Sequence, residues 1–155
     1  MNLFILSFNP RIAAEHHCDK HVVKMILETA QLLYTAHPVP RPGGYKPTHK
    51  NHPCAIWTRE SLDNYLWACQ LGLALCDEYT FRYGKVHKTQ AHLEWLVANP
   101  PELPRIGITE IRQAMPEEFK RPNPVDAYRA YYLGAKARLL RYSKRSPPDF
   151  VAKAM

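Results

Sequence analysis

The chain has 155 residues, 46% of them hydrophobic, and carries a formal net charge of +7. This length is enough for one domain with its own core, and the hydrophobic content is ordinary for a globular protein. Residues 121–155 contain eight Lys or Arg and two acids, so almost all of the net charge lies there. Such an excess favours a polyanionic partner. The alternative is a basic protein whose charge serves only solubility.

Neither secretion nor membrane insertion is indicated. No apolar run approaches the length of a membrane span, and residues 1–6 are too short and too uncharged for a signal peptide. The cysteines form no CxxC pair, so we interpret all four as reduced thiols: Cys18, Cys54, Cys69 and Cys76. We therefore expect a cytoplasmic protein without a membrane partner, located in the host cytoplasm if a phage encodes it.

The first part of the chain predicts an extended segment, a long helix and a loop. Residues 3–8 are apolar and favour a strand or extended segment. A helix is expected to start with Asn9 as N-cap and Pro10 in its first turn and to continue to about His37. Its apolar residues recur at three- and four-residue spacing: Val22, Val23, Ile26, Leu27, Ala30, Leu33 and Tyr34. Residues 38–53 contain five prolines and two glycines, which indicates a loop.

A second long helix is expected from about Pro53 to Tyr83, ending at Gly84. Its apolar face repeats at helical spacing, and the helix is long enough to bend. A third helix is expected from about His87 to Ala98, where the sequence Asn-Pro-Pro stops it.

The remaining chain predicts a connection and a basic helix. Residues 100–124 are rich in proline, with a short helical piece expected near residues 108–114. A last helix is expected over residues 125–142. The whole pattern predicts an all-α, single compact domain over residues 1–155, built on two long helices with a basic C-terminal helix.

A row of polar side chains follows one side of the first long helix. Lys20, Lys24, Glu28 and Gln31 are spaced so that they share a face. The row can be read as an ordinary surface ion pair between Lys24 and Glu28, or as a carboxylate held in a cleft by neighbouring cations. Glu78 and Arg82 on the second helix, also four residues apart, allow the same two readings.

The histidines allow a metal site as an alternative. His17 and His21 are four residues apart, a spacing that lets two imidazoles bind one ion. Further ligands could come from His37, His49, His52 or Asp19. No HExxH or CxxC motif accompanies the pair, however, and histidines also cap loops, bond buried carbonyls or contact phosphates. We therefore assign no metal and no cofactor.

Two further stretches favour nucleic acid. Thr48–Pro53 precedes a helix start, where free backbone N–H groups attract anions such as phosphate; a simple cap formed by Asn51 or His52 is the alternative. The run Tyr128–Tyr132 with Lys136, Arg138 and Arg141 interleaves aromatic and basic residues, which suits stacked bases and phosphates. In the alternative reading of that run, the tyrosines fill the core and the arginines are solvated.

A family resemblance is carried by four stretches. They are residues 12–16 at the opening of the first helix, Glu28 followed by Gln31 and Leu32, His52 with Trp57 soon after, and residues 115–120 with the basic, aromatic region beyond. Together they resemble the pyrimidine-dimer DNA glycosylases of the phage endonuclease V type. The chain is also similar, over most of residues 1–95, to phage and bacterial proteins that share the patterns DKHVVKMILETAQLL, NHP and EYTFRYGK. That second similarity brings no activity with it.

The resemblance implies that Glu28 is the catalytic glutamate and that the nucleophile is an N-terminal amine. The family uses the α-amine of a threonine that is exposed when methionine is removed. Here residue 2 is Asn, whose bulk is expected to keep Met1. The Met1 amine is expected to be partly uncharged near neutral pH, and it could attack the C1′ atom of a sugar.

Two departures from the family shift the expected DNA contacts. The arginines that flank the family's glutamate are replaced here by Leu27 and Gln31, so phosphate contacts would have to come from Lys20, Lys24 and Arg59. The aromatic tail of the family is reduced to residues 147–150. A fold can host several chemistries, so the fold carries over more securely than the activity.

We therefore expect a monomeric DNA glycosylase, with or without an AP lyase step, that acts on a damaged or modified base in DNA. Its expected catalytic residues are Met1, Lys24, Glu28 and His52. Its expected DNA contacts are Lys20, His21, Gln31, Asn51, Arg59, Arg129, Arg138 and Arg141. The alternatives are a hydrolase or transferase that acts on a nucleotide or modified nucleoside, and a non-catalytic DNA-binding protein.

Overall fold

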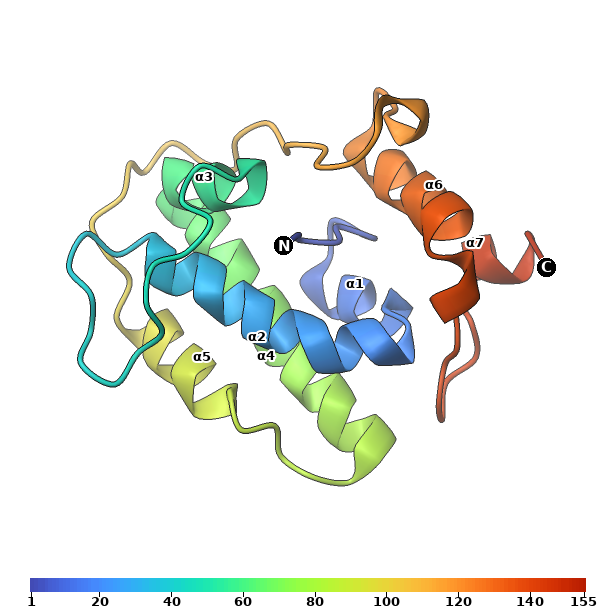
Figure 1. Cartoon of the computed structure of the whole chain (residues 1–155), viewed down its shortest axis with the longest axis horizontal. Coiled ribbons are helices and arrows are strands. Elements are labelled where there is room, and N and C mark those ends of the chain that lie inside the picture. The colour runs from blue at the N-terminus through green and yellow to red at the C-terminus, as the bar shows by residue number, and fades with distance from the viewer.

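The computed structural model describes all 155 residues and contains helices and no strands, so the predicted all-α class is confirmed (Figure 1). The α-helices are α1 (Pro10–His16), α2 (Asp19–Thr35), α3 (Pro53–Glu60), α4 (Leu62–Tyr83), α5 (Gln90–Ala98), α6 (Pro124–Ala135) and α7 (Asp149–Ala152). Two short 3₁₀ turns accompany them, η1 (Glu117–Phe119) and η2 (Ala137–Leu139). None of the helices is both long enough and apolar enough to cross a membrane.

The core lies around α4 and the opening residues of the chain. Helix α4 packs against α1, α2, α3 and α5. The extended segment Leu3–Leu6 is fully buried and belongs to the same core. Figure 1 shows the N-terminus in the middle of the molecule, with α2 and α3 on one side and α6 on the other. The first residue of the chain is therefore held inside the fold and does not extend from it.

Two predicted helix ends are confirmed in detail. The Asn9 side chain accepts hydrogen bonds from the backbone N–H groups of Arg11 and Ile12, with Pro10 in the first turn of α1. The predicted second long helix ends as expected at Gly84, which follows α4 in the left-handed conformation with φ of 72°. Glycine adopts that conformation without steric cost.

Each of the two long predicted helices is divided in two. The first breaks after His16, where His17 adopts an extended conformation before α2 begins at Asp19. The second breaks at Ser61, which is extended and whose hydroxyl accepts a hydrogen bond from the Asn64 N–H at the start of α4. Ser61 is thus an N-cap inside what the periodicity presents as one helix.

The predictions for the C-terminal third were partly wrong. Residues 108–114 are irregular, because side chains of other elements bond their backbone: Trp57 donates to the Thr109 carbonyl and Asn64 accepts from the Thr109 N–H. The last long helix ends at Ala135 and does not reach Tyr142. The elements η1 and α7 were not predicted.

Candidate active site and basic groove

The N-terminus is positioned by the side chain of Asn2. Its Oδ1 atom accepts hydrogen bonds from the Leu3 N–H at 2.8 Å and from the Tyr128 hydroxyl at 3.2 Å, and the Cys54 thiol lies 3.4 Å away. Its Nδ2 atom donates to the Ala114 carbonyl at 2.9 Å. Asn2 is buried, so one amide side chain ties the start of the chain to α3, α6 and the connection before η1.

Met1 is thereby placed against the middle of α2. Its α-amino nitrogen lies 3.3 Å from Glu28 Oε1, and the side chains of the two residues are largely buried, with exposed fractions of 5% and 11%. The other oxygen, Oε2, lies 3.6 Å from the ammonium of Lys24, one helical turn earlier and mostly exposed. Glu28 therefore contacts the terminal amine on one side and a solvent-facing cation on the other.

His52 lies near the same group of charges, at the start of α3. Its Nδ1 atom accepts a hydrogen bond from the Cys54 N–H at 3.0 Å, so His52 is the N-cap, as in one of the two sequence readings. Its pKa is lowered by partial burial and then by the positive charge of the N-terminus, while Glu28 raises it. A neutral ring that accepts at Nδ1 carries its hydrogen at Nε2, so His52 has a donor free of the cap.

A groove of about 620 Å³ lies beside this site and is lined by several cations. Lys20 and Lys24 come from α2, and Lys136 and Arg138 come from the turn after α6. The one carboxylate on the groove wall, Asp19, is engaged by Arg82 and by the Ser143 N–H and hydroxyl. Lys24 lines the groove and also contacts Glu28, so the groove and the Met1–Glu28 site are adjacent.

His21 also lines the groove, but as part of the core. Its ring stacks on Phe4 at 4.4 Å, and its Nδ1 atom lies 2.7 Å from the Tyr132 hydroxyl. Burial lowers the pKa of His21 to about 3, so the ring is neutral near pH 7. A neutral ring has no charge with which to attract phosphate, so the predicted contact of His21 with DNA would not be an ionic one.

The other predicted DNA contacts are dispersed. Gln31 is half-buried on α2, one turn after Glu28, and Asn51 is exposed before α3. Arg59 lies on α3 and donates to the Lys50 carbonyl at 2.7 Å. Gln31 therefore shares its helix with Glu28, and Asn51 and Arg59 belong to the loop and helix on either side of His52.

The two remaining predicted arginines lie in the C-terminal part of the chain. The guanidinium of Arg129 is used within the protein, where it donates to the Leu6 carbonyl at 3.0 Å and lies over the Phe150 ring. Arg141 is exposed, and its carbonyl accepts the N–H of Asp19. Neither residue lines the basic groove.

The metal alternative finds no support in the arrangement of the histidines. No group of three or more His, Cys, Asp or Glu side chains is placed to hold a metal ion. His17 is fully buried, and its Nδ1 atom lies 2.6 Å from the Ala13 carbonyl. Burial lowers its pKa to about 4, which identifies a neutral core histidine.

Glu78 and Arg82 form a structural ion pair. Arg82 is fully buried and donates from Nε to Glu78 at 2.7 Å and from its two Nη atoms to the carbonyls of Glu15 and His17. Arg145 also binds both oxygens of Glu78, at 2.7 and 2.8 Å. Arg82 thus bonds the backbone at the break between α1 and α2. Because Arg82 and Arg145 engage both oxygens of Glu78, we interpret Glu78 as a structural residue and not as a carboxylate that acts in a cleft.

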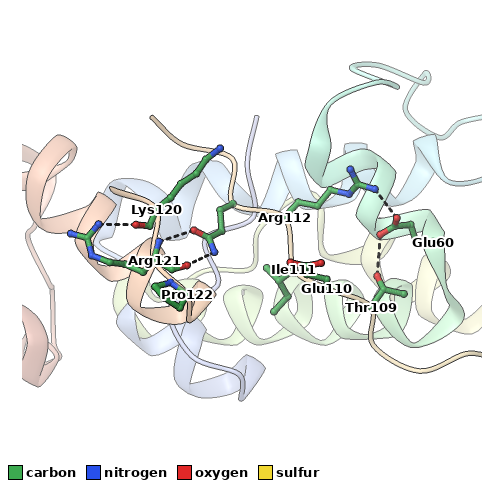
Figure 2. Close-up of a pocket in the computed structure, with 9 residues that line it drawn as sticks. Glu60, Thr109, Glu110, Ile111, Arg112, Lys120, Arg121 and Pro122 are labelled. Atoms are coloured by element: carbon green, nitrogen blue, oxygen red, sulfur yellow. Dashed lines mark hydrogen bonds and ion pairs between the residues drawn. The ribbon is translucent and has the colours of Figure 1, made fainter. Parts of the chain in front are cut away.

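A second, slightly larger groove of about 660 Å³ lies along residues 109–113 and 120–122, next to Glu60. Figure 2 shows Arg112 extending to Glu60, which also accepts from the Thr109 hydroxyl. The ammonium of Lys120 is paired with Glu117. Because these charges are satisfied locally and no residue of the Met1–Glu28 site lines this groove, we do not place the chemistry here.

Sequence reasoning missed three contributors to the site and the basic groove. Asn2 was considered only for its bulk, although it is the one polar residue in an apolar opening. Lys136 was assigned to a nucleic-acid helix, whereas it lies in a turn on the groove wall. Tyr83 was treated as a helix end, and no local signal indicates that it lines the groove.

Comparisons of the chain with protein-family models, with curated proteins and with solved structures give no significant match. The family resemblance drawn from the sequence therefore stays an expectation. The case for a function depends on the geometry described above.

Proposed function

We propose that this protein is a DNA glycosylase, with or without an AP lyase step, acting on a damaged or modified base through the α-amine of Met1. The observation that carries the proposal is the distance of 3.3 Å between the Met1 nitrogen and Glu28 Oε1. An amine nucleophile is activated by an adjacent general base, and Glu28 lies where such a base is needed. The proposal takes Met1 as the first residue of the mature protein.

The proposed reaction begins when Glu28 accepts a proton from the Met1 ammonium. The freed amine forms a bond to C1′ of the target nucleotide, and the glycosidic bond breaks with its electron pair leaving on the base, which takes up a proton. The leaving base takes this proton from Glu28, and the carboxylate restored in this way stabilises the positive charge that develops on the sugar. Opening of the sugar ring then gives an imine between Met1 and C1′. Water hydrolyses the imine to leave an abasic site. Alternatively, the imine loses a C2′ proton to the Glu28 carboxylate and the C3′–O bond breaks, which releases the downstream strand with its phosphate.

The surrounding cations supply the contacts that hold the strand. Lys24 lies between Glu28 and the basic groove, so it can contact a phosphate next to the reacting sugar. The free Nε2–H of His52 can donate to another phosphate without carrying charge. Lys20 and Arg138 extend the positive surface away from the site. These cations attract a polyanionic strand to the groove next to the Met1–Glu28 site.

Borohydride trapping tests the chemistry. The intact protein, with Met1 verified by mass, is incubated with duplexes that contain an abasic site or a damaged base, and the imine is reduced to a stable amine. We expect a covalent adduct whose modified peptide contains Met1. One glycine added before Met1 should abolish it. The absence of an adduct with every duplex, or an adduct on a lysine, would contradict the proposed nucleophile.

Glu28→Gln tests the proposed base. Loss of an acid–base group costs about 10²- to 10⁴-fold in rate, so trapping should slow by that factor. Glu94→Gln, the same change at an exposed position on α5, is the matched control and should trap as the parent does. Equal rates in the two variants would exclude Glu28 from the chemistry.

A non-catalytic DNA-binding protein is the second candidate, favoured by the basic groove itself. In that case the contact of Met1 with Glu28 is an ion pair that holds the N-terminus. Glu28→Gln would then leave DNA binding unchanged, no adduct would form, and binding would weaken steeply with added salt.

A further inference from the structure

The basic groove has an apolar and aromatic part as well as cations. Val23 of α2 and Tyr83 at the end of α4 both line it, with exposed fractions of 41% and 39%. Leu139 lies on the side of η2. A surface that only attracts phosphate needs no exposed aromatic ring. A groove that also receives a planar, apolar group such as a nucleobase does.

The cations of the groove are available to a ligand. Lys20 and Arg138 are exposed and have no acidic partner within 4.0 Å, and the ammonium of Lys136 lies over the Tyr131 ring at 5.2 Å. The groove volume of about 620 Å³ falls within the range of pockets that hold small molecules, about 300–1,000 Å³. Positive charge, an aromatic face and this volume together match a nucleotide.

We propose that the groove between α2, the end of α4 and η2 binds an unpaired stretch of a DNA strand, with one base stacked on Tyr83 and phosphates held by Lys20, Lys136 and Arg138. A base in a duplex is stacked on both faces, so only an unpaired base can present a face to the ring. Lys24, shared with Glu28, connects this groove to the Met1–Glu28 site. The inference rests on the proposed function in taking DNA as the ligand.

The test measures equilibrium binding of a fluorescein-labelled oligothymidylate by anisotropy. Stacking of one base on an aromatic ring contributes about 5- to 150-fold in affinity, so Tyr83→Leu should weaken binding by that factor. Tyr83→Phe keeps the ring and should bind as the parent does. Phe81→Leu is the matched control, because Phe81 lies on the same helix, is exposed, and does not line the groove. Thermal melts establish that each variant is folded.

Three results would overturn the inference. Equal affinities of Tyr83→Leu and Phe81→Leu would remove the ring from the contact. A loss in Tyr83→Phe equal to that in Tyr83→Leu would assign the contact to the hydroxyl. The charges are tested separately with Lys20→Gln/Arg138→Gln, which should reduce the salt slope of single-strand binding by about 1.4. An unchanged slope would place the phosphates elsewhere.

These measurements use an undamaged strand and involve no covalent step. A failure of borohydride trapping with intact oligothymidylate binding would therefore refute the glycosylase chemistry and leave the groove assignment standing. The reverse pattern, trapping without any effect of Tyr83→Leu on strand binding, would refute the groove assignment alone.

Discussion

Replacing Asn2 with Leu tests how the N-terminus is held. Leu is chosen because its bulk at position 2, like that of Asn, is expected to preserve Met1, which an intact mass verifies. The change leaves the Leu3 N–H and the Ala114 carbonyl without the bonds that Asn2 supplies at 2.8 and 2.9 Å. Two such buried groups cost about 2–6 kcal/mol. The added apolar burial of Leu offsets about 1–2 kcal/mol, so the middle of the two ranges gives a net loss in unfolding free energy of about 2.5 kcal/mol.

Urea unfolding followed by tryptophan fluorescence measures this loss. Where the variant is still folded, trapping should slow by about 10²-fold, because a shift of the amine by about 1 Å misplaces it relative to Glu28. Asn99→Leu is the control, since Asn99 is exposed and bonds only the Trp95 carbonyl of its own helix; it should change stability by less than about 0.5 kcal/mol. If Asn2→Leu matches that control in both assays, Asn2 does not position the site.

Two further predictions concern the buried charges and histidines. The folded chain protonates His17 only near pH 4 and His21 only near pH 3, but the unfolded chain does so near pH 6.5. Stability should therefore be full above about pH 6.5 and fall as pH decreases toward 3, by on the order of 1–3 kcal/mol per histidine; equal urea midpoints near pH 7.5 and pH 4.5 would contradict this. Arg82→Met should cost about 3–5 kcal/mol of unfolding free energy, because it leaves Glu78 and Asp19 without their buried partner. A loss below about 1 kcal/mol would show that Arg145 and Ser143 suffice.

The features predicted correctly are those specified by neighbouring residues. Asn9 and Pro10 start α1 because a cap and a fixed φ act within one turn. Gly84 ends α4 because only its own backbone has to turn left-handed. The i, i+4 contact of Lys24 with Glu28 follows from helix geometry alone.

The features that were missed depend on residues far away in the sequence. The break between α1 and α2 is stabilised by Arg82, which donates to carbonyls 65 and 67 residues earlier. The last helix stops at Ala135, and the chain then returns so that the Arg141 carbonyl and Ser143 bond Asp19 at the start of α2. Gly134 lies so close to the Phe119 ring that no Cβ would fit. Local helix propensity cannot anticipate such tertiary contacts.

The contact of Met1 with Glu28 also depends on residues far away in the sequence, and this dependence determines how the site should respond to mutation. Asn2 is bonded to residues 112 and 126 positions away, so the amine is placed by α6 and by the connection before η1, although the carboxylate belongs to α2. Helix α6 bonds Asn2 directly through Tyr128, whose hydroxyl also bonds the Arg112 carbonyl. Loss of that one hydroxyl should displace the amine while Lys24 and Glu28 keep their geometry.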